Sequence, residues 1–147
     1  ALAREFYAES LSIRRKLIVD HGETEEKLID MIFSLNLLAQ SWICYEQSED
    51  AIVTAAKPLY AESLAIGRKL IFDKGETAER LRYIRSSIAG LCTIATKNEE
   101  TVKKQFLVEL SSIKFKLINS YGATIEQKED LTEHESNEDL DFNWTFD

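Results

Sequence analysis

The chain has 147 residues with five glycines and one proline. That length suffices for one domain with a core, and so few turn residues argue against a protein of many strands. The net charge of −8 belongs to the end of the chain, because positions 126–147 hold nine of the 26 acidic residues and one of the 18 basic ones. The near-neutral remainder lacks the basic field that nucleic-acid binding needs, and no apolar run approaches the ~20 residues of a membrane span.

The predicted elements follow from a repeated sequence. Residues 7–28 (YAESLSIRRKLIVDHGETEEKL) return 53 positions later as residues 60–81 (YAESLAIGRKLIFDKGETAERL), and a weaker third copy covers 107–127. Apolar residues recur at helical spacing on both sides of each Gly-x-Thr. The pattern predicts an all-α chain with helices at about 3–20, 24–46, 49–73, 77–97 and 99–121. Pro58 falls in the third helix, so we expect a kink or a break near residues 54–57.

The connections between these helices have their own residue signals. Glycine takes the left-handed conformation that ends a helix at little cost, and threonine, serine and asparagine oxygens cap the first turn of the next. The expected helix-ending glycines are Gly22, Gly75 and Gly122. The expected N-caps are Thr24, Thr77, Thr124, Ser48 and Asn98. An anion-binding glycine loop is the alternative, but acidic residues flank each loop and would repel an anion.

Cys44 and Cys92 lie within apolar helical stretches. We expect reduced thiols in the core and therefore a cytoplasmic protein. The sequence begins with Ala1 and has no basic start followed by an apolar segment, which is the signature of a signal peptide. Because the first residue is alanine and not methionine, we expect a processed chain or a piece of a longer protein.

The order of small and large residues resembles a tetratricopeptide repeat (TPR). SLNLLAQSW (34–42) resembles the first helix of such a repeat and AAKPLYAESLAI (55–66) the second, with a degraded copy in SIAGLCTIA (87–95) and QFLVELSSI (105–113). The 53-residue period exceeds the usual spacing of about 34, so long-repeat bacterial members are most similar. Over residues 1–125 the resemblance implies antiparallel helix hairpins stacked as a short right-handed α-solenoid, used as a protein-interaction scaffold.

In proteins of this family the first helix of each pair lines a concave groove. The resemblance therefore implies that a peptide or protein partner contacts Asn36, Gln40, Ile43, Arg82, Arg85, Ala89 and Thr93. Amide side chains can bond an extended peptide backbone, and arginines can take an acidic group in a bidentate manner. Ordinary solvated polar residues are the alternative interpretation. The Lys/Asn set with which chaperone-binding relatives hold a terminal carboxylate is not matched.

No pattern of catalytic or metal-binding residues has support. No Ser/His/Asp or Cys/His set is evident, and the spacing of Asp139, Asp141 and Asn143 resembles a calcium loop but lacks its glycine and closing glutamate. We predict no enzymatic activity, no metal and no cofactor. The alternative functions are a regulatory TPR segment of a larger enzyme or signalling protein, and a structural homo-oligomer formed through the tail or the repeat ends.

The acidic segment 126–147 ends in three alternating aromatic residues, Phe142, Trp144 and Phe146. A fully disordered segment is usually poor in aromatics. We expect this tail either to dock in a groove through those side chains or to remain a disordered solubilising end.

Overall fold

The computed structural model describes residues 2–122, and all the regular structure in that range is helical. The helices are α1 (Leu2–His21), α2 (Glu25–Tyr45), α3 (Glu49–Lys74), α4 (Ala78–Ile94), the short 3₁₀ helix η1 (Lys97–Glu99) and α5 (Glu100–Asn119). The predicted all-α class is confirmed, and four helix spans agree within two residues. The chain divides into two compact units, Ala1–Leu110 and Ser111–Asp147.

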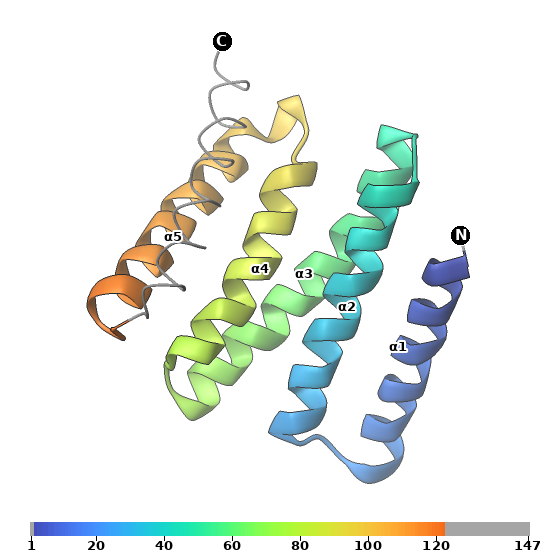
Figure 1. Ribbon diagram of the computed structural model, residues 1–147, viewed down its shortest axis with the longest axis horizontal. Helices are drawn as coiled ribbons and strands as arrows, with labels where there is room; N and C mark the ends of the chain where they lie inside the picture. Colours follow the sequence, from blue (N-terminus) through green and yellow to red (C-terminus); the bar gives the residue numbers. More distant parts are fainter. Residues whose placement is uncertain (1, 123–147) are drawn as a thin grey trace. The chain divides into compact units, whose positions relative to one another are not determined.

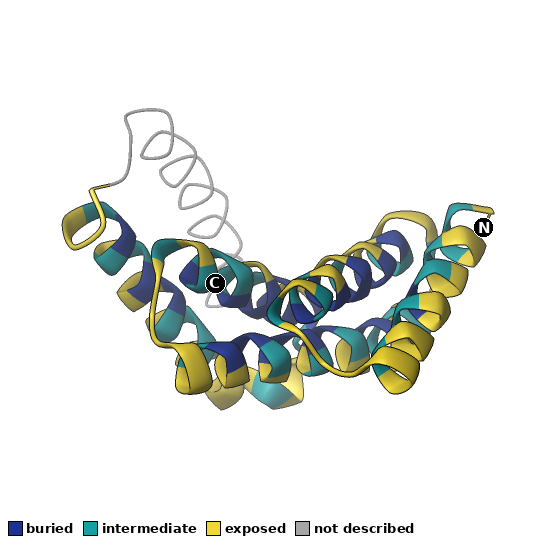
Figure 2. Ribbon diagram, turned by 90° about the horizontal axis from the view of Figure 1, so that it is seen from below, coloured by how far each residue is buried: buried dark blue, intermediate teal, exposed yellow. Residues whose placement is uncertain are grey.

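In the first unit, helices that follow one another in sequence pack together. α1 contacts α2, α2 contacts α3 and α3 contacts α4, while α2 also contacts α4. Consecutive helices run in opposite directions (Figure 1). Figure 2 shows the buried residues gathered between the helices and the exposed residues on their outer sides and in the connections.

The core rests mainly on α2, which is buried along most of its length. One cluster joins Leu11 of α1 to Met31, Leu35 and Leu38 of α2, with Trp42 and Leu59 packed against it. A second cluster joins Leu28 and Ile32 of α2 to Leu70 of α3. Among residues 2–122, α2 is the one helix whose length and hydropathy would allow it to cross a membrane, which was not expected from the sequence. The core helix of a helical stack passes the same test. In contrast, α1 buries only Leu11.

The Gly-x-Thr connections form as predicted. Gly22 and Gly75 have φ of +84° and +92°, and their N–H groups donate to Ile18 O and Ile71 O at 2.9 Å. The hydroxyl oxygens of Thr24 and Thr77 each accept the backbone N–H three residues on, at 3.2 Å. The residue whose N–H is accepted, Lys27 or Arg80, also bonds the glycine at the end of the preceding helix. Lys27 Nζ donates to Gly22 O at 2.9 Å, and Arg80 Nη1 donates to Gly75 O at 3.0 Å.

We expect Thr77→Ala to lower the free energy of unfolding by about 1 kcal/mol, because it removes the acceptor for the Arg80 N–H at the start of α4. Urea denaturation measures the change. The matched control is Thr93→Ala in the same helix, where the hydroxyl donates to Ala89 O and caps nothing. Equal losses in the two variants would contradict a capping role for Thr77.

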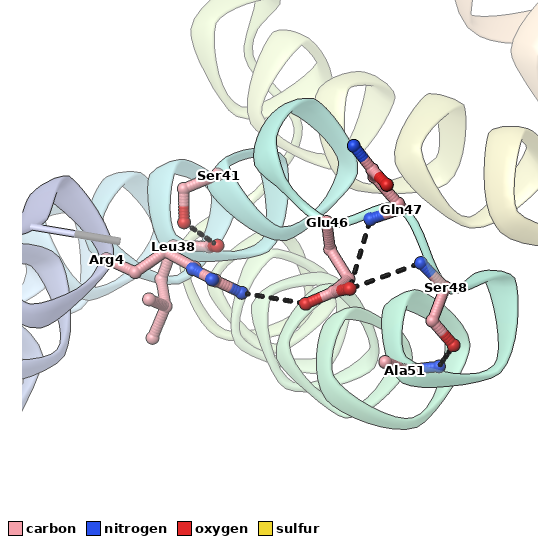
Figure 3. A network of polar contacts seen from close by, with 7 residues as sticks. All are labelled: Arg4, Leu38, Ser41, Glu46, Gln47, Ser48 and Ala51. Carbon is pink, nitrogen blue, oxygen red and sulfur yellow. Dashed lines mark hydrogen bonds and ion pairs between the residues drawn. The ribbon is translucent and has the colours of Figure 1, made fainter.

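The turn between α2 and α3 is fixed by Glu46 (Figure 3). Its carboxylate accepts the backbone N–H groups of Gln47 at 3.0 Å and Ser48 at 3.1 Å, and Arg4 of α1 lies 3.5 Å away. The two backbone hydrogen bonds, Ser48 first, and the Arg4 charge hold the pKa of Glu46 below its usual value. Ser48 then caps α3 by accepting the Ala51 N–H at 3.3 Å, which confirms one predicted N-cap.

Three local predictions were wrong or incomplete. α4 ends at Ile94, and Asn98 lies inside η1, where it caps no helix. α3 continues through Pro58 without a break. Cys92 is buried but Cys44 is exposed, because nine residues from the buried Leu35 is about two and a half turns and places Cys44 on the opposite side of α2.

Two glycines allow α3 and α4 to approach closely. A Cβ on Gly67 of α3 would lie 2.6 Å from Cγ2 of Ile84, and one on Gly90 of α4 would overlap the ring of Tyr60. Beside them the hydroxyls of Ser63 and Ser87, both fully buried, bond to each other at 2.8 Å. The pairing satisfies two polar groups that would otherwise be costly inside the core.

Tyr60 should ionise unusually late. Burial of the ring and, to a smaller extent, the charge of Cys44 raise the pKa of Tyr60 from 10.0 to about 12. The folded state therefore keeps this proton more tightly than the unfolded state does, so its contribution to stability is intact below pH 10 and is lost as the pH rises towards 12. We expect the last step in a tyrosinate absorbance titration to disappear in Tyr60→Phe. A late step that persists in this variant would contradict the assignment.

The described part of the second unit is the end of α5 and the turn after it. Ile113 and Leu117 are buried, and Gly122 has a φ of +58°, as predicted for the third glycine. Thr124 and the tail with Phe142, Trp144 and Phe146 lie outside the described residues.

Candidate functional site: the α2–α4 face

The residues predicted to contact a partner lie on two helices that touch each other, α2 and α4. We call their shared outer side the α2–α4 face. Gln40 and Thr93 are exposed on it, and the other five predicted residues are half-buried. The helices α2 and α4 run in the same direction (Figure 1), and Ser87 lies beside Asn36. Because Arg82 lies five residues before Ser87 and Ile43 lies seven residues after Asn36, Arg82 and Ile43 are about 18 Å apart along the helices. The face is therefore long enough for an extended segment of several residues.

A hydrogen bond joins the two helices at the middle of this face. Ser87 Oγ lies 3.4 Å from Asn36 Oδ1, and Ser63 of α3 lies behind it at 2.8 Å from the same Ser87 oxygen. The single Ser87 hydroxyl hydrogen is shared between Asn36 Oδ1 and Tyr83 O, which lies 3.3 Å away in the same helix. The amide NH₂ group of Asn36 has no hydrogen-bond partner among the described residues. The sequence predicted Asn36 as a contact residue but not the two serines that position it.

The face also carries two exposed apolar residues that were not predicted from the sequence. Phe33 and Leu37 of α2 are 50% and 45% exposed. Phe33 meets Tyr83 of α4 edge to face, with ring centroids 5.5 Å apart. Phe33 and Leu37 lie one helical turn apart and next to the predicted Asn36 and Gln40, so the spacing alone could have identified them.

The charge on the face comes mainly from α4. Arg82 and Arg85 are half-buried one turn apart on that helix. At its start Arg80 bonds Glu25 of α2 at 2.6 Å. Burial and the carboxylates of Glu79 and Glu25 raise the pKa of Tyr83, against the opposing effect of Arg80. Tyr83 is therefore a neutral hydroxyl at ordinary pH, able to donate or accept a hydrogen bond.

A second feature lies elsewhere in the first unit. A cavity of about 380 Å³ is lined by α3, the end of α4, η1 and the beginning of α5. The wall is apolar, with Leu64, Leu91, Ile94, Val102 and Phe106 among its residues. Two ion pairs border it, Lys57–Glu99 and Arg68–Glu109, each at 2.7 Å. The cavity was not predicted from the sequence.

The α2–α4 face combines exposed apolar rings, an amide, hydroxyls and two guanidinium groups. Among residues 2–122 no three His, Cys, Asp or Glu side chains are grouped to hold a metal ion. No family model, curated protein or solved structure matches this chain.

Proposed function

We propose that the protein is a non-catalytic, TPR-like interaction scaffold that binds a peptide or protein partner on its α2–α4 face. The observation that carries the proposal is the exposure of Phe33 and Leu37 beside Asn36, whose side-chain oxygen lies 3.4 Å from the Ser87 hydroxyl of α4. Exposed apolar side chains next to oriented polar groups are typical of a recognition surface.

The repeated sequence supports the scaffold part of the proposal. Equivalent residues of successive copies form equivalent connections, including the pairs Lys27–Gly22 and Arg80–Gly75. A single helix pair of this kind leaves a face uncovered, and stacked copies cover one another and present an extended surface. TPR-like stacking is the arrangement that the sequence resemblance implies for such copies.

The same residues define the chemistry of the partner. Phe33, Leu37 and the edge of Tyr83 fit one or two apolar side chains. Asn36 can bond the backbone of an extended segment, and Arg82 with Arg85 suits an acidic residue placed toward the start of α4. The expected ligand is therefore an extended peptide with apolar residues followed or preceded by an acidic one.

The proposal can be tested with a displayed library of random peptides selected on the 147-residue protein. We expect enriched peptides to carry that pattern and to lose binding at least tenfold to Phe33→Asp, with a further loss in Arg82→Glu/Arg85→Glu. The matched control is Phe72→Asp, which makes the same change at a 90% exposed position near the end of α3. Circular dichroism establishes that each variant is folded.

Equal binding to Phe33→Asp and Phe72→Asp would overturn the assignment of the face. A library that yields no enriched peptide would argue against peptide binding. Mass that rises with protein concentration and falls in Phe33→Asp would favour the homo-oligomer alternative.

A further inference from the structure

The cavity described above has an equivalent elsewhere in the first unit, because both of its bordering ion pairs occur twice. Lys57–Glu99 corresponds to Arg4–Glu46, since each residue lies 53 positions after its counterpart. Arg68–Glu109 corresponds to Arg15–Glu62, since Arg68 lies 53 positions after Arg15 and Glu109 lies 47 positions after Glu62, the shorter spacing of the weaker third copy. In both pairs an arginine of one copy meets the glutamate of the next. The ion pairs of α1 with the end of α2 and with α3 therefore recur as the ion pairs of α3 with η1 and with α5.

The apolar residues between those ion pairs also correspond, with one exception. In the first set Trp42 and Leu59 both pack against the buried cluster that contains Leu11 and Leu38. Leu64 and Leu91, which lie 53 positions after Leu11 and Leu38, line the cavity. Phe106, 47 positions after Leu59, lines it as well. The counterpart of Trp42 is Ala95, which also lines the cavity. The cavity is therefore lined by the counterparts of residues near Trp42, but it has an alanine where the first copy has the indole ring.

We propose that this cavity binds the indole ring of a tryptophan supplied by another protein. Trp42 shows what such an occupant meets. It packs against the apolar cluster of α1 and α2, and the guanidinium of Arg4 lies 4.1 Å from its ring centroid. Lys57 stands at the position of Arg4 and keeps its carboxylate partner. A cation over an indole face is the most favourable pairing of its kind.

The cavity is open to such a ligand. Ala61, Ala65 and Val102 line it and are exposed. Phe106 is larger than its counterpart Leu59 and occupies part of the space, yet about 380 Å³ remains. That volume lies within the range of small-ligand sites. This inference does not depend on the α2–α4 face, because the two sites share no residue.

The test uses the 147-residue protein and N-acetyl-tryptophanamide as the probe. We expect saturable amide chemical-shift changes at Ala61, Ala65, Val102 and their neighbours, and none with N-acetyl-alaninamide. Ala95→Trp should fill the cavity from within, raise the melting temperature and abolish these changes. Ala95→Leu adds a smaller side chain to the wall of the cavity and should weaken binding several-fold. The matched control is Val108→Trp, which adds an indole at a 71% exposed position outside the cavity and should leave binding unchanged.

Three results would overturn the proposal. They are the absence of saturable shifts, unchanged binding in both Ala95 variants, and stronger binding after removal of residues 126–147. The last result would mean that the chain's own Trp144, and not a partner, competes for the cavity. Phe33→Asp should bind the probe normally, so failure of this inference and failure of the proposed function are separate outcomes.

Discussion

Leu35→Ala is expected to lower the free energy of unfolding by about 3 kcal/mol. Leu35 is fully buried at the centre of the cluster that joins α1 to α2. Its truncation removes apolar surface from the core and leaves a cavity that packed helices can close only in part. Urea denaturation gives the change directly, provided that the dependence on urea keeps the same slope.

The matched control is Leu37→Ala, which makes the same truncation two residues further along α2. Leu37 is 45% exposed, so its loss should cost less than about 1 kcal/mol. Similar losses for the two variants would contradict the orientation of α2 on which the α2–α4 face depends.

Gly90→Ala is expected to destabilise the protein by about 2 kcal/mol, although alanine is normally the better helix residue by about 1 kcal/mol. The reason is the ring of Tyr60, which occupies the space that the new methyl group would need and is itself 5% exposed. Helix propensity alone predicts that Gly90→Ala stabilises the protein, whereas the overlap with Tyr60 predicts that it destabilises the protein. The sign of the change in the free energy of unfolding therefore shows which effect is larger.

A double variant measures whether the overlap with Tyr60 is the cause. Gly90→Ala combined with Tyr60→Leu should be more stable than the sum of the single changes predicts, by about 1 kcal/mol. Additive effects, or a gain in stability in Gly90→Ala alone, would show that α3 and α4 are further apart than the structure has them.

The sequence predicts the helices and their connections well because these depend on local signals. The Gly-x-Thr pattern supplies a left-handed residue and a cap within three positions, and Gly22 and Thr24 adopt the expected roles. The signal at Asn98 was misleading, since η1 replaces a direct helix start there. Of the two outcomes expected at Pro58, a kink or a break, the break is absent, because α3 continues from Glu49 to Lys74.

The packing between helices was harder to predict, because it depends on which copy a residue belongs to. Gly67 and Gly90 replace Arg14 and Leu37 of the first copy, and both allow close contact between α3 and α4. The change from Trp42 to Ala95 was visible as a difference between copies. Its consequence, a cavity between retained ion pairs, needed the structure.

The residues of the candidate site also depend on packing between helices, which the sequence does not give directly. The sequence resemblance selected five polar positions together with Ile43 and Ala89 on α2 and α4, and the structure places those helices in contact. It did not select Phe33, because a single aromatic residue in an apolar helix is most often part of the core. The exposure of that ring depends on how α1, α3 and α4 surround α2.

The most direct test of the proposed function is to map a library-selected peptide onto the protein by amide chemical-shift changes. Binding on the α2–α4 face predicts that the changes concentrate at Phe33, Leu37, Gln40 and Tyr83 and that Phe33→Asp removes them. Changes confined to the cavity residues Ala61, Ala65 and Val102, or spread without focus over the helices, would contradict the proposal that partners bind on the α2–α4 face.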